Sequence, residues 1–243
     1  MTKRTSAAFT LIELLVVITI IAILASIALP AFTSVQQKGK QTKALSNGKQ
    51  IALALRLFAS DHDGTYPSYV VDANGNPANP PVNVASSNDA FCQLFPTYLK
   101  SEAIFYVGGS AWCSASAPDE VTDLTLTVPS TNTLKTGENE WAFVLLLNDT
   151  FNPSVPLIAD GFTSGGATTH VYTKDQSLQG GVWKGQIAMV IRADGSSGAA
   201  QKVDPTSLTV IGPNGGAAPG DIFTTGNGAN GWLGLTNVVV NPK

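Results

Sequence analysis

The sequence is poor in cysteine, histidine and charged residues, and each shortage excludes a class of protein. Two cysteines and two histidines among 243 residues are too few for a disulfide-dense scaffold or for the paired ligands of a structural zinc site. Charged residues make up 13% of the chain, with 14 basic and 17 acidic side chains. Binding to a polyanion depends on clustered lysine and arginine, so nucleic acid is not an expected partner.

The sequence also lacks a catalytic or cofactor-binding motif. Asp160, Ser164 and His170 are the residue types of a hydrolytic triad, but no nucleophile elbow surrounds them. Residues 72–76 alternate oxygen-bearing side chains as a calcium loop does, but a proline follows where such a loop needs glycine. The glycine pairs are not followed by the lysine of a phosphate loop. We therefore expect no enzyme, no cofactor and no metal.

What the sequence does contain is one long apolar run near its N-terminus, from Phe9 to Leu29. About 20 apolar residues in a helix cross the hydrocarbon core of a bilayer, so this run predicts a membrane-spanning helix. The eight residues before it carry Lys3 and Arg4, which favours a cytoplasmic N-terminus. The rest of the chain is then expected on the other side of the membrane.

Glu13 is the only ionisable residue in this apolar run. A carboxylate at the centre of a bilayer costs about 2.5 kcal/mol or more, so it calls for a partner. Two simpler explanations stay open, namely a position near the interface and a favourable interaction with the positive end of the helix. An ordinary signal peptide gives no reason for an acid at this place.

The segment Ala8-Phe9-Thr10-Leu11-Ile12-Glu13 resembles the cleavage motif of type IV prepilins and type II secretion pseudopilins. The resemblance implies that prepilin peptidase cuts between Ala8 and Phe9 and methylates the new amine of Phe9. Glycine usually precedes the cut in that family, whereas this chain has Ala8. The resemblance also implies that Glu13 pairs with the amine of a neighbouring subunit. Pro30 stands where pilins often carry a proline, which can kink the helix.

Beyond Pro30 an apolar stripe at helical spacing predicts that the helix continues to about Asp61, with Gly64 as terminator. The segment around Asp61 and the Asp-Gly pair at Asp194 resemble a prepilin-like branch common in planctomycete and verrucomicrobial proteins. The match is partial, because Lys184 stands where that branch has histidine. Runs of strand-forming residues separated by turn-rich stretches predict strands at the following segments: 124–128, 141–147, 186–192, 201–203 and 238–240.

The expected fold is therefore α+β and pilin-like, with one long helix packed on an antiparallel sheet. We divide the chain into a leader (1–8), a membrane or filament helix (9–30), its amphipathic continuation (31–64) and a loop-rich head (65–243). Cys92 and Cys113 form either a disulfide, if the head is extracytoplasmic, or two buried thiols.

The expected function is a structural subunit of a type II secretion pseudopilus or of a type IV pilus-like filament. Its expected partners are prepilin peptidase, other pilin or pseudopilin subunits and the inner membrane, with an extracytoplasmic head and a later place in a periplasmic or cell-surface filament. The alternative is a monomeric, membrane-tethered module that binds, for example, a glycan through its tryptophans.

Overall fold

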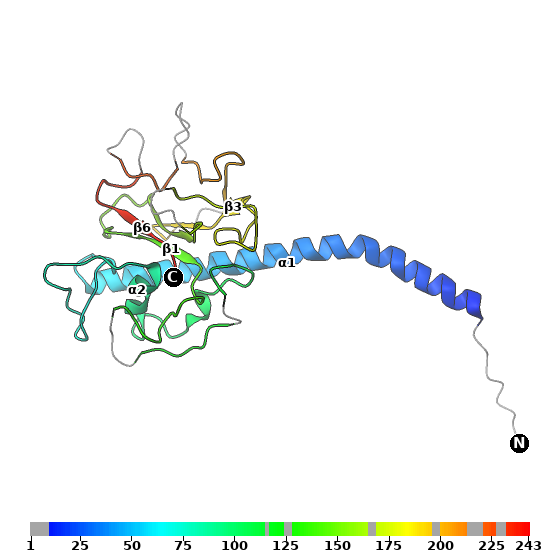
Figure 1. Ribbon diagram of the computed structural model, residues 1–243, viewed down its shortest axis with the longest axis horizontal. Coiled ribbons are helices and arrows are strands. Elements are labelled where there is room, and N and C mark those ends of the chain that lie inside the picture. The colour runs from blue at the N-terminus through cyan, green and yellow to red at the C-terminus, as the bar shows by residue number, and fades with distance from the viewer. Residues whose placement is uncertain are drawn as a thin grey trace, which may run out of the picture. The chain divides into compact units, whose positions relative to one another are not determined.

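A computed structural model of the chain describes residues 10–114, 117–123, 128–164, 169–195, 200–212, 221–226 and 232–243. The described part contains one long helix, several short helical turns and two antiparallel sheets (Figure 1). The predicted α+β, pilin-like class is thereby confirmed. In chain order the elements are α1 (Leu11–Asp61), α2 (Ser87–Phe91), η1 (Cys92–Leu94), η2 (Glu102–Ile104), β1 (Trp141–Leu145), β2 (Pro156–Asp160), β3 (Ile187–Ala188), β4 (Val190–Arg192), β5 (Gln201–Lys202) and β6 (Val238–Val240).

Helix α1 runs without interruption over 51 residues and ends where the sequence predicts. Gly64 adopts a φ of 77°, which glycine tolerates without steric cost. Its N–H donates to the carbonyl of Ala59 at 2.8 Å, and the N–H of His62 donates to the same carbonyl at 3.1 Å. The carbonyl of Ala59 lies in the last turn of the helix, where carbonyls have no donor within the helix, so these two bonds satisfy it.

The chain divides into two compact units, Met1–Thr42 and Lys43–Lys243. The boundary falls inside α1, so the helix contributes to both. Among the described residues before position 43 none is buried, whereas the second unit includes a stripe of buried helix residues. The C-terminal part of α1 therefore belongs to the head. Its buried residues are Ala44, Asn47, Gly48, Ile51, Ala52, Ala54, Leu55, Phe58 and Ala59.

The main sheet has four antiparallel strands in the order β4-β2-β1-β6. Its two central strands, β1 and β2, are buried at every residue, as expected for strands covered on both faces. Strands β3 and β5 form a second, two-stranded sheet.

Most of the predicted strands are present, although they are shorter than expected. The segment 186–192 forms both β3 and β4, and β5 and β6 lie within their predicted ranges. Strand β2 was not predicted. Residues 124–127 of the first predicted strand lie outside the described residues.

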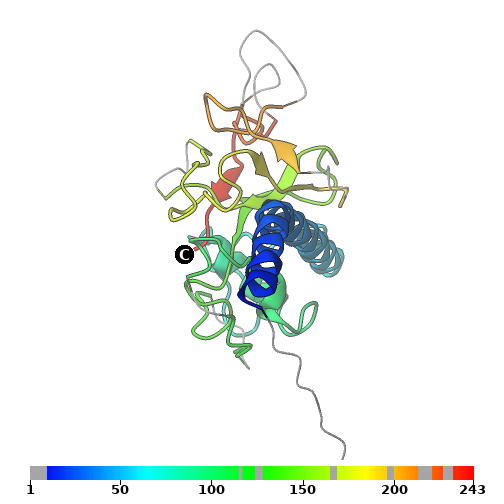
Figure 2. The ribbon, with the colours of Figure 1, turned by 90° about the vertical axis from the view of Figure 1, so that its right-hand side faces the viewer.

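The sheet packs against the head part of α1, and Gly48 is a point of close approach. A Cβ atom at Gly48 would lie 2.9 Å from Trp141 Cη2 and 2.9 Å from Ile191 Cγ1. Arg56 adds a polar contact by donating to the carbonyl of Asp194 at 2.9 Å. Figure 2 shows the sheet on one side of this part of the helix, and α2 with its loops on the other.

Candidate functional site

Helix α1 begins with a reciprocal cap formed by Thr10 and Glu13. The backbone N–H and the hydroxyl of Thr10 donate to Glu13 Oε2 at 2.8 and 2.6 Å, and the N–H of Glu13 donates to Thr10 Oγ1 at 3.3 Å. This arrangement is a capping box, in which each residue satisfies a donor at the start of the helix. Ala8 and Phe9, which flank the predicted cleavage point, lie outside the described residues.

The described helix residues up to Val35 present apolar side chains on every side. The large hydrophobic residues from Leu11 to Val35 are between 47% and 78% exposed. By length and composition α1 is able to cross a membrane, with a mean hydropathy of 2.8 over 18 residues. Because patches of this kind are rare on soluble monomers, this surface calls for lipid or protein to cover it.

Pro30 lies inside α1, and the helix continues through it. Proline has no N–H, so the carbonyl of Ser26, four residues earlier, loses its usual helical donor. Thr33 Oγ1 donates to the carbonyl of Pro30 at 2.9 Å. The helix therefore does not melt locally at Pro30.

Cys92 and Cys113 are free and buried, which corresponds to the second of the two arrangements expected. Each thiol has its own backbone contact: Cys92 Sγ donates to the carbonyl of Asp89 at 3.2 Å, and the N–H of Val107 donates to Cys113 Sγ at 3.4 Å. Burial raises the pKa of both thiols to about 12, so they are poor nucleophiles at neutral pH.

The triad residues considered from the sequence have other partners. Nδ1 of His170 lies 2.5 Å from Asp221 Oδ2, whereas Asp160 Oδ2 accepts from Trp183 Nε1 at 2.7 Å and from the N–H of Met189 at 2.6 Å. Ser164 is exposed. These contacts give no support to a hydrolytic triad.

The residues considered as calcium ligands near Asp72 form a turn. Asp72 Oδ1 accepts from the backbone N–H groups of Asn74 and Asn76, both at 2.9 Å. Gly75 supplies the positive φ, 82°, that this turn requires. The hydrogen bonds lower the pKa of Asp72, with the bond from Asn76 contributing most.

The tryptophans that would serve a glycan site are mainly core residues. Trp112, Trp141 and Trp183 are buried, and Trp112 Nε1 donates to the carbonyl of Phe162 at 2.8 Å. Trp232 is partly buried, and the guanidinium of Arg192 lies 5.8 Å from its ring centre. These four described tryptophans therefore form no row of exposed aromatic faces for sugar stacking.

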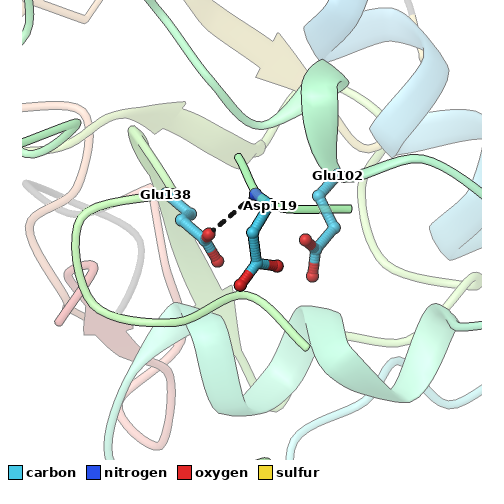
Figure 3. A group of neighbouring side chains, drawn as sticks. All are labelled: Glu102, Asp119 and Glu138. Atoms are coloured by element: carbon cyan, nitrogen blue, oxygen red, sulfur yellow. Dashed lines mark hydrogen bonds between the residues drawn. The ribbon is translucent and has the colours of Figure 1, made fainter. Parts of the chain in front are cut away.

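A group of acidic side chains that the sequence analysis did not identify lies in the loop-rich region before β1. Glu102, Asp119 and Glu138 each offer one oxygen, and these oxygens lie within 4.8 Å of one another (Figure 3). The three residues are far apart in the sequence, and neither their spacing nor their neighbours resembles a known metal loop. The available signal was only a stretch with many acids and few lysines.

Comparisons with known proteins concern the N-terminal segment. The family profile for the prokaryotic N-terminal methylation motif matches residues 3–29. The type IV major pilin protein PilA of Myxococcus xanthus is 47% identical over 55 residues, which are 23% of this chain and 25% of that pilin. The matched segment thus spans about a quarter of the curated relative's length. No solved structure matches the chain.

Proposed function

We propose that the whole chain is a structural subunit of a pilus-like filament. Its N-terminal segment matches the prokaryotic N-terminal methylation motif and resembles a type IV major pilin, which supports this assignment. Prepilin peptidase would cut between Ala8 and Phe9 and methylate Phe9. Helix α1 would hold the subunit in the inner membrane until assembly, and the head would face the extracytoplasmic side. The filament is either a type II secretion pseudopilus or a type IV pilus.

The observation that carries this proposal is the exposed apolar surface of α1. Every described residue from Thr10 to Gln36 is exposed, and Glu13 is the only ionisable side chain in that stretch. Burial of apolar surface contributes about 25 cal/mol per Å², so lipid before assembly and neighbouring helices after it both stabilise this part of the chain. A tethered binding module would use the lipid in the same way, and Glu13 would then serve only to cap the helix.

Cleavage before Phe9 would create an ammonium group four residues from Glu13. The Glu13 carboxylate has two oxygens, and the capping box uses only Oε2, so Oε1 remains for the amine of a neighbouring subunit. An ion pair in a core of low dielectric is costly to break, at about 3 to 5 kcal/mol when one partner is removed. Glu13 would therefore select the register in which each carboxylate meets an amine.

The test uses the full-length chain in its native host, with intact mass and filament incorporation as readouts. We expect a mature species that begins at Phe9 and is heavier by one methyl group. Glu13→Gln keeps an oxygen that can accept from Thr10 but removes the charge, and Glu13→Ala removes both. Removing one partner of the ion pair at a cost of about 3 kcal/mol corresponds to about a hundredfold less incorporation of the subunit into filaments. We expect this reduction in both variants, while membrane insertion continues.

Two results would contradict the proposal. A species cut after Leu29, or left uncut, would remove Glu13 from any role in assembly and favour the tethered module. Normal filaments from Glu13→Gln, with failure only in Glu13→Ala, would mean that the residue caps the helix and does not pair between subunits.

A further inference from the structure

Three segments of the head bring their carboxylates to one place. Glu102 lies in η2, Asp119 lies in the loop that follows Cys113, and Glu138 lies just before β1. Figure 3 shows the Glu102 and Glu138 side chains on either side of Asp119, with the carboxyl groups directed toward a common space. One oxygen from each lies within 4.8 Å of the other two.

Glu102 is the member of the group that most needs a partner. Its side chain is completely buried. Oε1 accepts from the N–H of Leu134 at 2.6 Å, but Oε2 has no hydrogen-bond partner in the described part of the chain. A buried polar atom without a partner costs about 1 to 3 kcal/mol, and more when it is charged. Burial raises the pKa of Glu102 to about 7, the Leu134 N–H opposes this, and Glu138, Asp119 and Glu120 add to the rise.

The other carboxylates are held in place by backbone donors. Glu138 accepts from the N–H of Asp119 at 3.1 Å and from the N–H of Lys135 at 2.7 Å. Glu120 lies beside the group and caps η2, since it accepts from the N–H groups of Glu102 at 3.0 Å and Ala103 at 3.2 Å. These bonds hold like charges close together before any ligand arrives.

One lysine partly balances the negative charge. Lys135 Nζ lies 2.5 Å from Asp119 Oδ2, and the two side chains are 41% and 38% exposed. An ion pair this exposed contributes at most about 1 kcal/mol, and a single ammonium does not reach the free oxygen of Glu102. The described surroundings therefore leave three neighbouring carboxylates with one lysine beside them, and Glu102 Oε2 stays buried without a partner.

We propose that Glu102, Asp119 and Glu138 bind one divalent cation, with calcium preferred. The donors are all carboxylate oxygens, which hard cations prefer, and the group contains neither the imidazole nor the thiolate that favours zinc. Calcium binds oxygen at about 2.3 to 2.6 Å, so oxygens on opposite sides of the ion lie about 4.6 to 5.2 Å apart. Magnesium needs a tighter octahedron at about 2.0 to 2.1 Å and usually keeps several of its waters, so a site built from three carboxylates suits calcium better.

A bound cation would connect η2 to the two loops that lead to β1. Glu102 Oε2 would gain the partner it lacks, and water would complete the coordination shell. The cation would compete with Lys135 for Asp119 Oδ2. This competition gives the site a distinctive response to mutation, because removing the lysine should tighten binding while removing a carboxylate should weaken it.

The experiment uses the purified full-length chain in detergent, freed of metal with a chelator. Calcium chloride is titrated by calorimetry, and the unfolding temperature is measured with calcium and with chelator. We expect saturable one-to-one binding, weaker binding of magnesium, and a higher unfolding temperature with calcium. Glu102→Gln should weaken calcium binding by about tenfold or more without lowering the unfolding temperature of the calcium-free protein, because a neutral amide has no unpaired buried charge.

Lys135→Met should tighten calcium binding, and Asp175→Asn serves as the matched control. Asp175 is an exposed acid whose hydrogen bonds lie within its own turn, so its loss should leave calcium binding unchanged. If Glu102→Gln does not fold, the opposite shifts expected from Lys135→Met and Asp119→Asn still test the site. Absence of saturable binding at millimolar calcium, or equal binding by the wild type and the Glu102 and Asp119 variants, would overturn the proposal.

Discussion

At the scale of single residues, two glycines of α1 provide a matched pair for testing the contact between helix and sheet. Alanine is favoured over glycine inside a helix by about 1 kcal/mol. At Gly39 nothing lies within 4 Å of an added Cβ, whereas at Gly48 the added atom meets Trp141 and Ile191 at 2.9 Å. Overpacking of a core costs about 1 to 3 kcal/mol, so the steric term should exceed the helical gain at Gly48 only.

We therefore expect Gly48→Ala to lower the free energy of unfolding of the head by up to about 2 kcal/mol. Gly39→Ala should leave it unchanged or slightly higher. Denaturant unfolding of the full-length chain in detergent, followed by tryptophan fluorescence, measures both. Equal effects at the two sites would mean that the core around Trp141 adjusts to the added methyl group without cost.

The sequence identified some candidate functional residues and missed others for a clear reason. Glu13 was found because a single acid in an apolar run is conspicuous without any knowledge of the fold. Glu102, Asp119 and Glu138 were not found because only the folded loops bring them within 4.8 Å of one another. The turn role of Gly64 was predicted from its local sequence and confirmed by its φ of 77°.

At the scale of elements, the structure places the start of the head core inside α1. Its buried residues begin at Ala44, and the compact unit of the head begins at Lys43. A chain that starts at residue 36 should therefore unfold cooperatively at nearly the same temperature as the full-length protein. A chain that starts at residue 50 loses Ala44, Asn47 and Gly48 and should be less stable by about 2 kcal/mol or more.

Thermal unfolding followed by circular dichroism distinguishes the two fragments. A fragment from residue 36 that fails to fold would show that the preceding helix stabilises the head. Equal stability of both fragments would show that the turns of α1 around Gly48 contribute little to the core.

Helices were easier to predict than strands. The apolar stripe of α1 repeats over many turns, so its end at Asp61 was predicted correctly. Strand β2 was missed because Pro156 and Asp160 at its ends resemble turn residues and leave only a short apolar run between them. Asp160 fits in the strand only because Trp183 and Met189 donate to its carboxylate, a condition set by the tertiary structure.

At the scale of the whole molecule, buried acids should make the stability of the head depend on pH. Glu140 and Asp160 are fully buried, and Glu140 Oε1 and Asp160 Oδ1 lack hydrogen-bond partners among the described residues. Burial raises the pKa of both, and the Asp160 charge raises the pKa of Glu140 further. Glu102 behaves in the same way, with a pKa of about 7.

The sign of the effect follows from proton binding. The ordinary pKa values of these acids are 4.5 for glutamate and 3.8 for aspartate, so the unfolded chain releases protons that the folded head retains. The free energy of unfolding should therefore fall as the pH rises from about 4 to about 7, by about 1.4 kcal/mol per pH unit for each proton retained. Exposed acids such as Asp204 have a lowered pKa, and their contribution is lost only below about pH 4.

Denaturant unfolding at several pH values between about 5 and 7.5, with chelator present, measures this slope. Asp160→Asn keeps an oxygen for Trp183 and Met189 but removes one titrating group, so it should flatten the profile. Its effect should add to that of Glu102→Gln, because the described hydrogen bonds of the two carboxylates share no partner. A free energy of unfolding that stays constant or rises over this range would mean that Glu140 and Asp160 are ionised in the folded head, and that a cation or water satisfies their free oxygens.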